Sequence, residues 1–493
     1  MMGVSIVESI GNALARLGET LTGALMTSVD FVYSWLLVYV LIIVGLGLTF
    51  YFGAPQLRNA GELWRSIRGS RGRSGGGITS FQAFAVGVGT RVGIGNIGGV
   101  ALALIVGGPG AIFWMWVVAI LGMATSMAES VLAQLYKVRH PDGSFRGGPA
   151  YYISKGLRAR PLAVIFALIT MVASGMAVPM VQINTVAGTL AVNHGVDRWV
   201  TTGVFFLALA PVILGGMRSV ARASEFLAPV MALIYVALTL VIVVMNPVAA
   251  WNALVLIVAS AFGFGQVAGG VAGGVFVALI NGARRGLFSN EAGLGTTPHA
   301  AGTATVSHPG TQGFVQAFGV GVDTLIVCTA TALMILVSGV YEPDLDPSRA
   351  ASLTAEGVTA SLGSWMALPM SIIIAVFAYT SAYGAYSYGQ VALDLFRPAR
   401  WVSLTYRTVV LIVASLGAVT SLVVVWALSD LLLGLGALVN LVAVAILARQ
   451  VRATLRDYLD QRRSGLEPVF DPARAANAGL RSTVWNREDT LQR

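Results

Sequence analysis

The sequence predicts an all-α protein that crosses a membrane many times. Of its 493 residues, 56% are hydrophobic and 11% are charged, whereas a soluble domain carries about 25% charged residues. The mean hydropathy is +0.78. Long apolar segments recur along the chain, and Lys and Arg gather in every second loop between them. These features exclude a soluble globular domain and indicate a polytopic membrane protein.

Eleven segments are long and apolar enough to cross a bilayer, because a membrane helix needs about 20 residues. They are 31–54, 80–105, 109–136, 161–191, 200–216, 223–246, 252–283, 312–340, 367–396, 402–428 and 430–448. Only Ser429 and Asp430 separate the last two segments. We therefore expect about eleven transmembrane helices.

The two ends of the chain differ from this apolar pattern. Residues 1–30 place Ile6, Ile10 and Leu14 at helical spacing, so we expect an amphipathic helix that lies on the membrane surface. Residues 449–493 are polar and rich in Arg. We expect them to form a cytoplasmic tail and not a second domain.

The distribution of Lys and Arg predicts the orientation in the membrane. With the N-terminus outside, 26 of the 31 Lys and Arg residues lie in the cytoplasmic loops and tail, and only Arg16, Arg198 and Arg349 lie outside. The positive-inside rule predicts this bias. We expect a multi-pass protein of the cell membrane, surrounded by lipid. Because the cytoplasmic face accounts for the net charge of +9, we expect no nucleic-acid partner.

The second segment holds the stretch GVGTRVGIGNIGGVA, residues 87–101, with six glycines and one arginine. The spacing Gly93-x-Gly95-x-x-Gly98 matches a dinucleotide-binding turn. That turn needs a preceding strand and an acidic residue about 20 positions on, whereas here the flanks are continuously apolar and the first acid is Glu129. We therefore reject a dinucleotide site.

The same stretch favours a membrane helix that is broken in the middle. Glycine tolerates non-helical backbone angles, and unwound backbone inside a membrane lines a cavity or is buried in protein. Freed carbonyls can coordinate a cation, and freed N–H groups can bind a carboxylate. This pattern suits a zwitterion that moves with Na⁺. Close packing of helices through small residues is the alternative.

A second glycine-dense stretch, SAFGFGQVAGGVAGGV at residues 260–275, lies five spans after the first. Because five is odd, two copies related by this spacing have opposite orientations in the membrane. Paired glycine-interrupted spans in inverted halves are typical of secondary transporters. We expect a first repeat at 80–246 and a second at 252–448, preceded by one extra membrane helix at 31–54.

Five blocks of the sequence closely resemble the alanine or glycine:cation symporter family. They are VGIGNIGGVALALIVGGPGAIFWMW (92–116), GMATSMAE (122–129), GGPAYYI (147–153), DTLIVCTATALMIL (323–336) and RGLFSNEAGLGTTPHAA (285–301). The resemblance implies a leucine-transporter-like fold with two inverted five-helix repeats after one extra helix. It also implies Na⁺- or H⁺-coupled uptake of small neutral amino acids, with Na⁺ as the coupling ion and no organic cofactor.

The resemblance assigns roles to residues of the first broken helix. The backbone N–H groups of Gly93, Gly95 and Asn96 would bind the substrate carboxylate. The carbonyls of Gly89 and Val92 would bind Na⁺.

The resemblance also assigns residues on two other spans. The hydroxyls of Thr380 and Ser381 would complete the Na⁺ site, with Ser381 also beside the substrate; bonding to their own helix is the alternative. Gln182 would contact the substrate, or would join two helices instead. By position alone, Ser260, Phe262 and Phe264 flank the second glycine-dense stretch and would close the pocket around the ammonium group and side chain, with simple packing as the alternative for the two Phe residues. We expect the block SNEAGLG, residues 289–295, to form an intracellular gate or hairpin rather than a binding site.

Two positions depart from the family pattern. The family commonly has Trp where Ala385 stands and Glu where Gln390 stands. Ala385 would lie on the wall of the substrate pocket. If the Tyr383 ring does not fill the space that a Trp at position 385 would occupy, the pocket is wider than alanine needs. A larger neutral amino acid could then be the substrate.

Three charged residues lie in or beside the apolar spans, where they are rare and mostly functional. Glu129 either pairs with an Arg or has another role. Asp323 is either structural or linked to a proton. Arg91 adjoins the first break and either pairs with Asp323 or Glu291 or neutralises the charge of the substrate.

Other functions stay open at this point. An H⁺-coupled symporter and a sensor that binds an amino acid without moving it are the alternatives to Na⁺-coupled symport. An enzyme is not expected, because no nucleophile–base pair or metal cluster is evident and the histidines are scattered among loops. The oligomeric state is open, with a monomer as one option.

Overall fold

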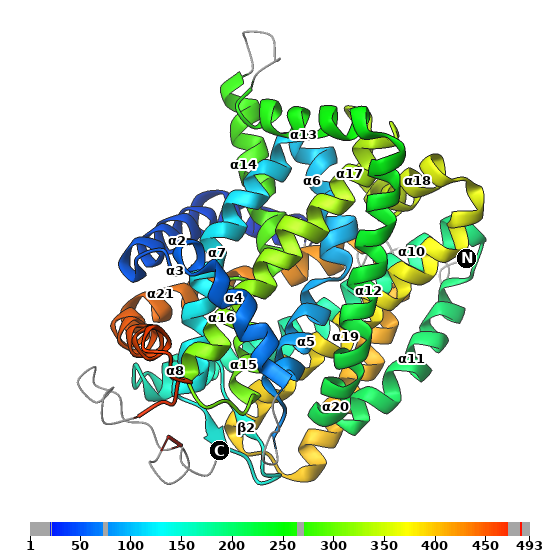
Figure 1. Cartoon of the computed structure of the whole chain (residues 1–493). Coiled ribbons are helices and arrows are strands. Elements are labelled where there is room, and N and C mark those ends of the chain that lie inside the picture. The colour runs from blue at the N-terminus through cyan, green and yellow to red at the C-terminus, as the bar shows by residue number, and fades with distance from the viewer. Residues whose placement is uncertain (1–19, 21, 72–76, 264–270, 472–483, 486–493) are drawn as a thin grey trace, which may run out of the picture.

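The computed structural model describes residues 20, 22–71, 77–263, 271–471 and 484–485. Within them, nine helices are long and apolar enough to cross a membrane, and the bent pair Ser80–Arg91 and Gly95–Gly107 makes ten. Helix α14, Val271–Asn290, has 20 residues and so reaches the length that a membrane helix needs. The prediction of an all-α, many-spanning membrane protein is confirmed, with nine or ten membrane-length apolar helices in the described part and α14 as a further one by length alone (Figure 1).

The first membrane helix covers Thr22–Phe52, so it begins before the predicted residue 31. Most of the expected amphipathic segment, residues 1–19 and 21, lies outside the described residues. The elements up to the first repeat are η1 (Val32–Leu37), α2 (Val38–Phe52), α3 (Pro55–Arg58), α4 (Ala60–Arg68) and η2 (Gly69–Arg71).

Five spans make up the first predicted repeat. Its elements are α5 (Ser80–Arg91), η3 (Gly95–Gly99), α6 (Val100–Gly107), α7 (Gly110–Leu135), β1 (Val138–Arg139), β2 (Phe145–Arg146), α8 (Pro149–Lys155), α9 (Arg160–Val172), η4 (Ala173–Ala177), α10 (Val178–His194), α11 (Arg198–Gly215) and α12 (Met217–Met245). The strands β1 and β2 pair antiparallel, with Val138 opposite Arg146.

The second half contains the remaining five spans. Its elements are α13 (Pro247–Ala261), α14 (Val271–Asn290), α15 (Pro298–Thr303), α16 (Pro309–Gly321), η5 (Val322–Cys328), α17 (Thr329–Val337), η6 (Pro347–Arg349), α18 (Ala350–Leu362), η7 (Ser364–Met366), α19 (Ala367–Leu393), η8 (Asp394–Phe396), α20 (Arg400–Leu416), η9 (Gly417–Val419) and α21 (Leu422–Arg463).

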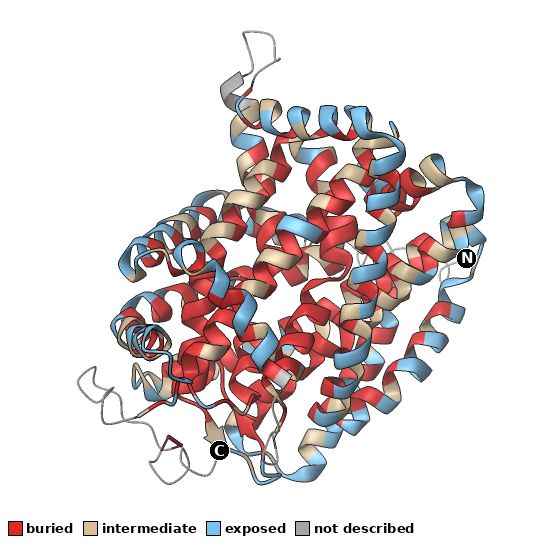
Figure 2. Cartoon of the chain, in the orientation of Figure 1, coloured by how far each residue is buried: buried red, intermediate tan, exposed pale blue. Residues whose placement is uncertain are grey.

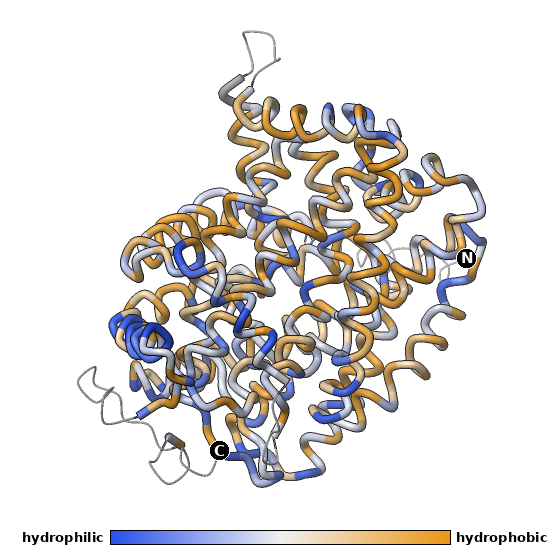
Figure 3. The backbone as a smooth tube through the Cα atoms, in the orientation of Figure 1, coloured by the Kyte–Doolittle hydropathy of each residue, from blue (hydrophilic) through white to orange (hydrophobic). Residues whose placement is uncertain are grey.

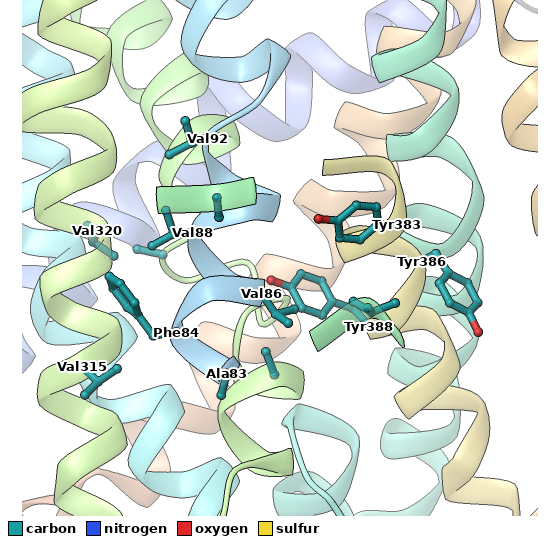
Figure 4. Packing of buried hydrophobic residues seen from close by; sticks show 14 of the residues in the cluster. Ala83, Phe84, Val86, Val88, Val92, Val315, Val320, Tyr383, Tyr386 and Tyr388 are labelled. Atoms are coloured by element: carbon teal, nitrogen blue, oxygen red, sulfur yellow. The ribbon is translucent and has the colours of Figure 1, made fainter. Parts of the chain in front are cut away.

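The outer faces of the bundle are apolar and exposed, as Figures 2 and 3 show together. Phe50, Leu207 and Val244 expose more than 70% of their surface, and each lies on a span. The central helices α5, α7, α16 and α19 are buried instead; Figure 4 shows Phe84 of α5 beside Val315 and Val320 of α16. An apolar shell around a buried centre is the arrangement that a lipid environment requires.

The predicted span 252–283 is wrong. It contains two elements, because α13 ends at Ala261 and α14 begins at Val271. Figure 1 shows α13 running across the top of the molecule between the ends of α12 and α14. With 15 residues, α13 is shorter than the roughly 20 residues that cross a bilayer.

The predicted boundary between the last two spans, at Ser429 and Asp430, is also wrong. The chain turns at Gly417–Val419, and α21 then runs without interruption through Asp430 to Arg463. Asp430 stays inside the helix because Arg284 and Arg285 of α14 each place a guanidinium nitrogen 2.8 Å from its Oδ2. The helical part of the predicted tail, up to Arg463, belongs to the same element.

We predict that Asp430→Asn destabilises the folded protein. The carboxylate is buried, and its loss leaves two guanidinium groups without their shared partner, which costs about 3–5 kcal/mol for a buried pair. The measurement is thermal unfolding of the purified protein in detergent. Asp460→Asn, on the exposed end of the same helix, is the control and should unfold like the wild type. An unchanged unfolding temperature for Asp430→Asn would contradict the proposed role of this ion pair.

Candidate functional site

The first broken helix starts from a well-defined cap. The Thr79 hydroxyl accepts the N–H of Gln82, and the Gln82 side chain accepts the N–H of Thr79, each at 3.0 Å, which is a capping box. Helix α5 ends at Arg91, Val92 leaves the helical region with ψ at 83°, and the chain resumes at Gly95 at an angle of 48°. The predicted break in this helix is therefore present.

Other helices approach the break closely, so Gly93 has no room for a side chain and Gly95 has little. A Cβ atom on Gly93 would lie 2.0 Å from the Ser381 Oγ of α19, and one on Gly95 would lie 3.1 Å from Phe288 Cδ1 of α14. The three predicted residues Gly93, Gly95 and Ser381 thus meet at one place. A larger side chain at Gly93 would separate α5 from α19.

Side-chain amides satisfy the backbone groups that the break sets free. The N–H of Gly93 donates to Asn96 Oδ1, and the N–H of Ile94 donates to Gln182 Oε1, each at 3.0 Å. Gln182 therefore reaches the break from α10, as the sequence predicts for a substrate contact. An incoming carboxylate offers the same acceptor oxygens as these two amides.

The predicted cation ligands lie together on α5 and α19. The Ser381 hydroxyl donates to the carbonyls of Gly89 and Thr90, at 3.2 and 2.7 Å. The Thr380 hydroxyl donates to the carbonyl of Phe377 on its own helix at 2.9 Å. Bonding within its own helix was the alternative to a role as a Na⁺ ligand. Val92 is fully buried at the end of α5.

A second broken helix lies where an intracellular gate was expected. The block SNEAGLG ends α14 at Asn290 and leaves a non-helical stretch before α15. Glu291, Gly293 and Gly295 have φ angles of 58°, 92° and 75°. A positive φ is strained for Glu and is concentrated at functional sites. The structure has a break at 291–297, whereas the predicted second stretch, 260–275, falls partly on residues 264–270, which lie outside the described residues.

Glu129 of α7 holds the second break in place. Its two carboxylate oxygens accept the N–H groups of Gly293 and Gly295, at 3.2 and 3.0 Å. Asn440 of α21 donates to the same carboxylate and to the carbonyl of Gly293. Within the described chain, Glu129 has no Arg within ion-pair distance, so its partners are backbone groups rather than the Arg considered above.

Asp323 connects the two broken helices. It is fully buried in η5 and accepts the side-chain N–H of Asn96 at 2.7 Å from the first break. The Ser289 hydroxyl, at the end of α14, donates to its other oxygen at 2.7 Å. Because the Asp323 carboxylate accepts hydrogen bonds from both broken helices, it couples the positions of these two helices.

Arg91 contacts two other helices. It donates to the Gln316 carbonyl of α16 and to the Ser126 hydroxyl of α7, each at 3.2 Å. Neither Asp323 nor Glu291 lies within 4 Å of its guanidinium as an ion pair in the described residues, so neither of the pairings considered above is present.

A small enclosed cavity lies between the two breaks. Its volume, counted as the space open to the centre of a water molecule, is about 10 Å³, roughly enough for one water. The lining residues are Thr90, Arg91, Gly95, Ser174, Val178, Gln182, Phe288, Glu291, Leu294, Thr296, Ala385 and Leu433. The predicted Gly95, Gln182 and Ala385 therefore share this wall with residues of the second break.

The other predicted pocket residues lie elsewhere. Ser260 is at the end of α13, where its carbonyl carbon is 2.7 Å from the position of a Cβ on Gly110. Phe262 packs on Phe113, with ring centroids 5.1 Å apart, and Phe264 lies outside the described residues. Ser260 does not line the cavity, because α13 packs against the start of α7.

Tyr383 does not line the cavity next to Ala385. Its ring packs edge-on against Tyr379 at 5.1 Å on α19, and Figure 4 shows it with Tyr386 and Tyr388 on that helix. Gln390 donates to Asp394 at 2.9 Å and is also absent from the lining.

The acid and the two glycines in SNEAGLG are the sequence signal that identifies the missed break.

Comparisons with known proteins agree with this arrangement. The model of the sodium:alanine symporter family matches residues 19–472. The amino-acid carrier protein AlsT of Bacillus subtilis is 43% identical over 90% of this chain and 93% of its own length. The probable sodium/glutamine symporter GlnT of the same organism is 41% identical over 90% and 91%. The sodium/alanine symporter AgcS of Methanococcus maripaludis is 39% identical over 79% and 86%.

A solved structure supports the fold. The crystal structure of MhsT in complex with L-phenylalanine matches 85% of this chain and 96% of its own chain, with a TM-score of 0.54 at 15% identity. At this identity the likeness shows the fold alone, which is the leucine-transporter type that the sequence predicts. The family match and these relatives together show that the chain belongs to the sodium:alanine symporter family, which consists of membrane transporters and not of enzymes.

Proposed function

We propose that this protein is a Na⁺-coupled symporter that takes up small neutral amino acids of the alanine or glycine type by alternating access. The observation that carries the proposal is the meeting of two broken helices at one buried cavity. A helix break in the middle of a membrane protein exposes backbone N–H groups, which carry a partial positive charge, and carbonyl groups, which carry a partial negative charge. Together these groups suit a zwitterion and a cation. The names of the relatives mention alanine and glutamine, which supports an amino-acid substrate.

The substrate carboxylate binds the backbone of the first break in this proposal. Support comes from the N–H groups of Gly93 and Ile94, whose present acceptors are the side-chain oxygens of Asn96 and Gln182. A carboxylate can replace these oxygens without leaving a donor unpaired. The proposed binding turn also includes the N–H groups of Gly95 and Asn96, of which the Asn96 N–H now donates to the Gly93 carbonyl at 3.1 Å.

The coupling ion binds between α5 and α19. Hard oxygen ligands suit Na⁺, and the predicted set contains the carbonyls of Gly89 and Val92 with the hydroxyls of Thr380 and Ser381. The Ser381 hydroxyl already lies at hydrogen-bond distance from the Gly89 carbonyl. When Na⁺ binds, this hydroxyl would turn its lone pairs toward the ion.

Alternating access requires two halves that move relative to one another. We assign them to residues 80–246 and 252–448, with the N-terminus outside and the tail from residue 449 in the cytoplasm. The bias of Lys and Arg toward alternate loops supports this orientation. Na⁺ and substrate favour the same state, so the Na⁺ gradient supplies the free energy for uptake.

We predict that Ser381→Ala weakens Na⁺ activation of uptake. Loss of one ligand weakens cation binding by about 1.5–3 kcal/mol. This raises the Na⁺ concentration for half-maximal uptake roughly ten- to 100-fold. The measurement is uptake of radiolabelled alanine into proteoliposomes at varied Na⁺, with choline as the replacement at fixed pH. Ser387→Ala, whose hydroxyl bonds to its own helix at Gly384, is the control. Full uptake in choline would show that Na⁺ is not the coupling ion.

We predict that Gly95→Leu abolishes uptake while the protein remains folded in the membrane. The added side chain meets Phe288 and Ser289 at the cavity wall, so it closes the space that the substrate needs. Gly47→Leu, on an open face of α2, is the control and should transport normally. Gel filtration checks that each variant is folded. Wild-type uptake by a folded Gly95→Leu variant would refute the proposed site.

A further inference from the structure

We propose that the C-terminal tail is an autoinhibitory latch, which restrains the inner ends of both broken helices and must release before the cavity opens on that side. The inner side is the side on which the tail lies, and it is cytoplasmic in the orientation proposed above. The latch consists of residues 468–470 and Trp485, which belong to the described part of the tail. Its effect on uptake rests on the proposed function, whereas its effect on the helices does not.

Trp485 is buried in the protein although the last helix, α21, ends at Arg463. Only 1% of the Trp485 surface is exposed. Its indole N–H donates to the carbonyl of Gln134 at 2.8 Å, and its ring centroid lies 4.6 Å from the Lys137 ammonium nitrogen. A Trp ring that faces a cation and has its N–H bonded makes a specific contact. The tail is therefore docked at a defined place, the inner end of α7.

The two residues that Trp485 contacts join α7 to α15. The side-chain amide of Gln134 and the ammonium of Lys137 both donate to the carbonyl of Ala304, each at 3.0 Å. Ala304 directly follows the last residue of α15. Gln134 and Lys137 are almost completely buried. Because hydrogen bonds are stronger where water is excluded, the Trp485 ring strengthens the joint between α7 and α15.

A second contact fixes the loop that follows α15. The Ser307 hydroxyl donates to the Pro468 carbonyl at 2.9 Å, and the N–H of Phe470 donates to the Ser307 carbonyl at 3.0 Å. The Phe470 ring packs edge-on against the rings of His308 and Trp485, with centroids 5.3 Å apart in each case. The two contacts of the tail therefore touch one another and form one unit.

The loop held by the tail is connected to both broken helices. Ile78 and Ala304 form a backbone bridge, and the N–H of Thr305 donates to the Ile78 carbonyl at 3.0 Å, just before the cap of α5. On its other side, the loop continues into α15, which follows the break where Glu291 and Thr296 line the cavity. Helix α15 has six residues and is about 9 Å long. The tail therefore restrains the inner ends of both broken helices within a short distance of the cavity.

This restraint opposes the movement that alternating access requires. The cavity is enclosed, so a path to the inner side forms only when the elements that close it move apart. The latch consists of two aromatic rings and three hydrogen bonds to backbone carbonyls, all of which water can replace at an aqueous surface. Release of the tail exposes the joint between α7 and α15 to water and so favours opening.

The first test measures how often the inner end of α15 opens. Thr303→Cys introduces a thiol at the last residue of α15, where the wild-type residue is 1% exposed. The native Cys328 is fully buried, and the protein without Thr303→Cys gives the background. Full-length protein in lipid nanodiscs is labelled with a hydrophilic maleimide. Adding Trp485→Ala should accelerate the labelling of Thr303→Cys about fivefold or more, because labelling follows the open population.

The second test measures uptake of radiolabelled alanine into proteoliposomes. Trp485→Ala should raise the maximal rate about two- to fivefold, because the latch slows opening of the cavity. Trp401→Ala is the control, since this Trp at the start of α20 is 71% exposed. It should change neither the labelling nor the uptake.

A second variant separates a latch from a structural brace. Trp485→Phe keeps an apolar ring and loses only the indole N–H, so it should fold even where Trp485→Ala does not, and should accelerate labelling about twofold. Unchanged or slower labelling in the folded variants, or labelling that is faster without faster uptake, overturns the latch. A wild type that takes up no amino acid rejects the proposed function instead, while the labelling experiment still tests the latch.

Discussion

The structure depends on one constraint: backbone groups that leave a helix inside a membrane must find other hydrogen-bond partners. The first break meets it with the side-chain amides of Asn96 and Gln182. The second meets it with the carboxylate of Glu129 and the amide of Asn440. Partners of the first break are neutral and replaceable by a ligand, whereas those of the second form a fixed support. In the proposed function, the first break therefore offers the groups that a ligand can take over, and the second holds its part of the cavity wall in place.

The same region carries an excess of negative groups. Glu129, Glu291 and Asp323 are buried around one buried cation, Arg91. Charges inside a membrane protein are costly unless they are balanced. A bound Na⁺ and the ammonium group of an amino acid each add one positive charge. In the proposed symport, binding of both would offset the negative groups of this region, so cation and substrate would favour the same state.

Most of the fold, and the first of the two helix breaks, could be predicted from the sequence. Glycine density predicted the first break correctly, because Gly93 and Gly95 are needed where α14 and α19 approach. Glycine density at 260–275 did not identify the break at 291–297; the stretch lies between the end of α13 at Ala261 and the early part of α14, which begins at Val271. The second break was missed because the block at 289–295 was interpreted as an intracellular gate or hairpin, although Glu291, Gly293 and Gly295 mark the break. Asp430 was mistaken for a boundary because its two arginine partners lie some 145 positions earlier.

The most direct test of this account is an experimental structure of the protein in a lipid nanodisc with Na⁺ and an amino-acid substrate. The account predicts density for the amino acid between residues 93–96 and 291–296. Its carboxylate should lie on the N–H groups of the first break, and an ion should lie between α5 and α19. A continuous helix through residues 87–98, or a ligand bound away from both breaks, would contradict the account.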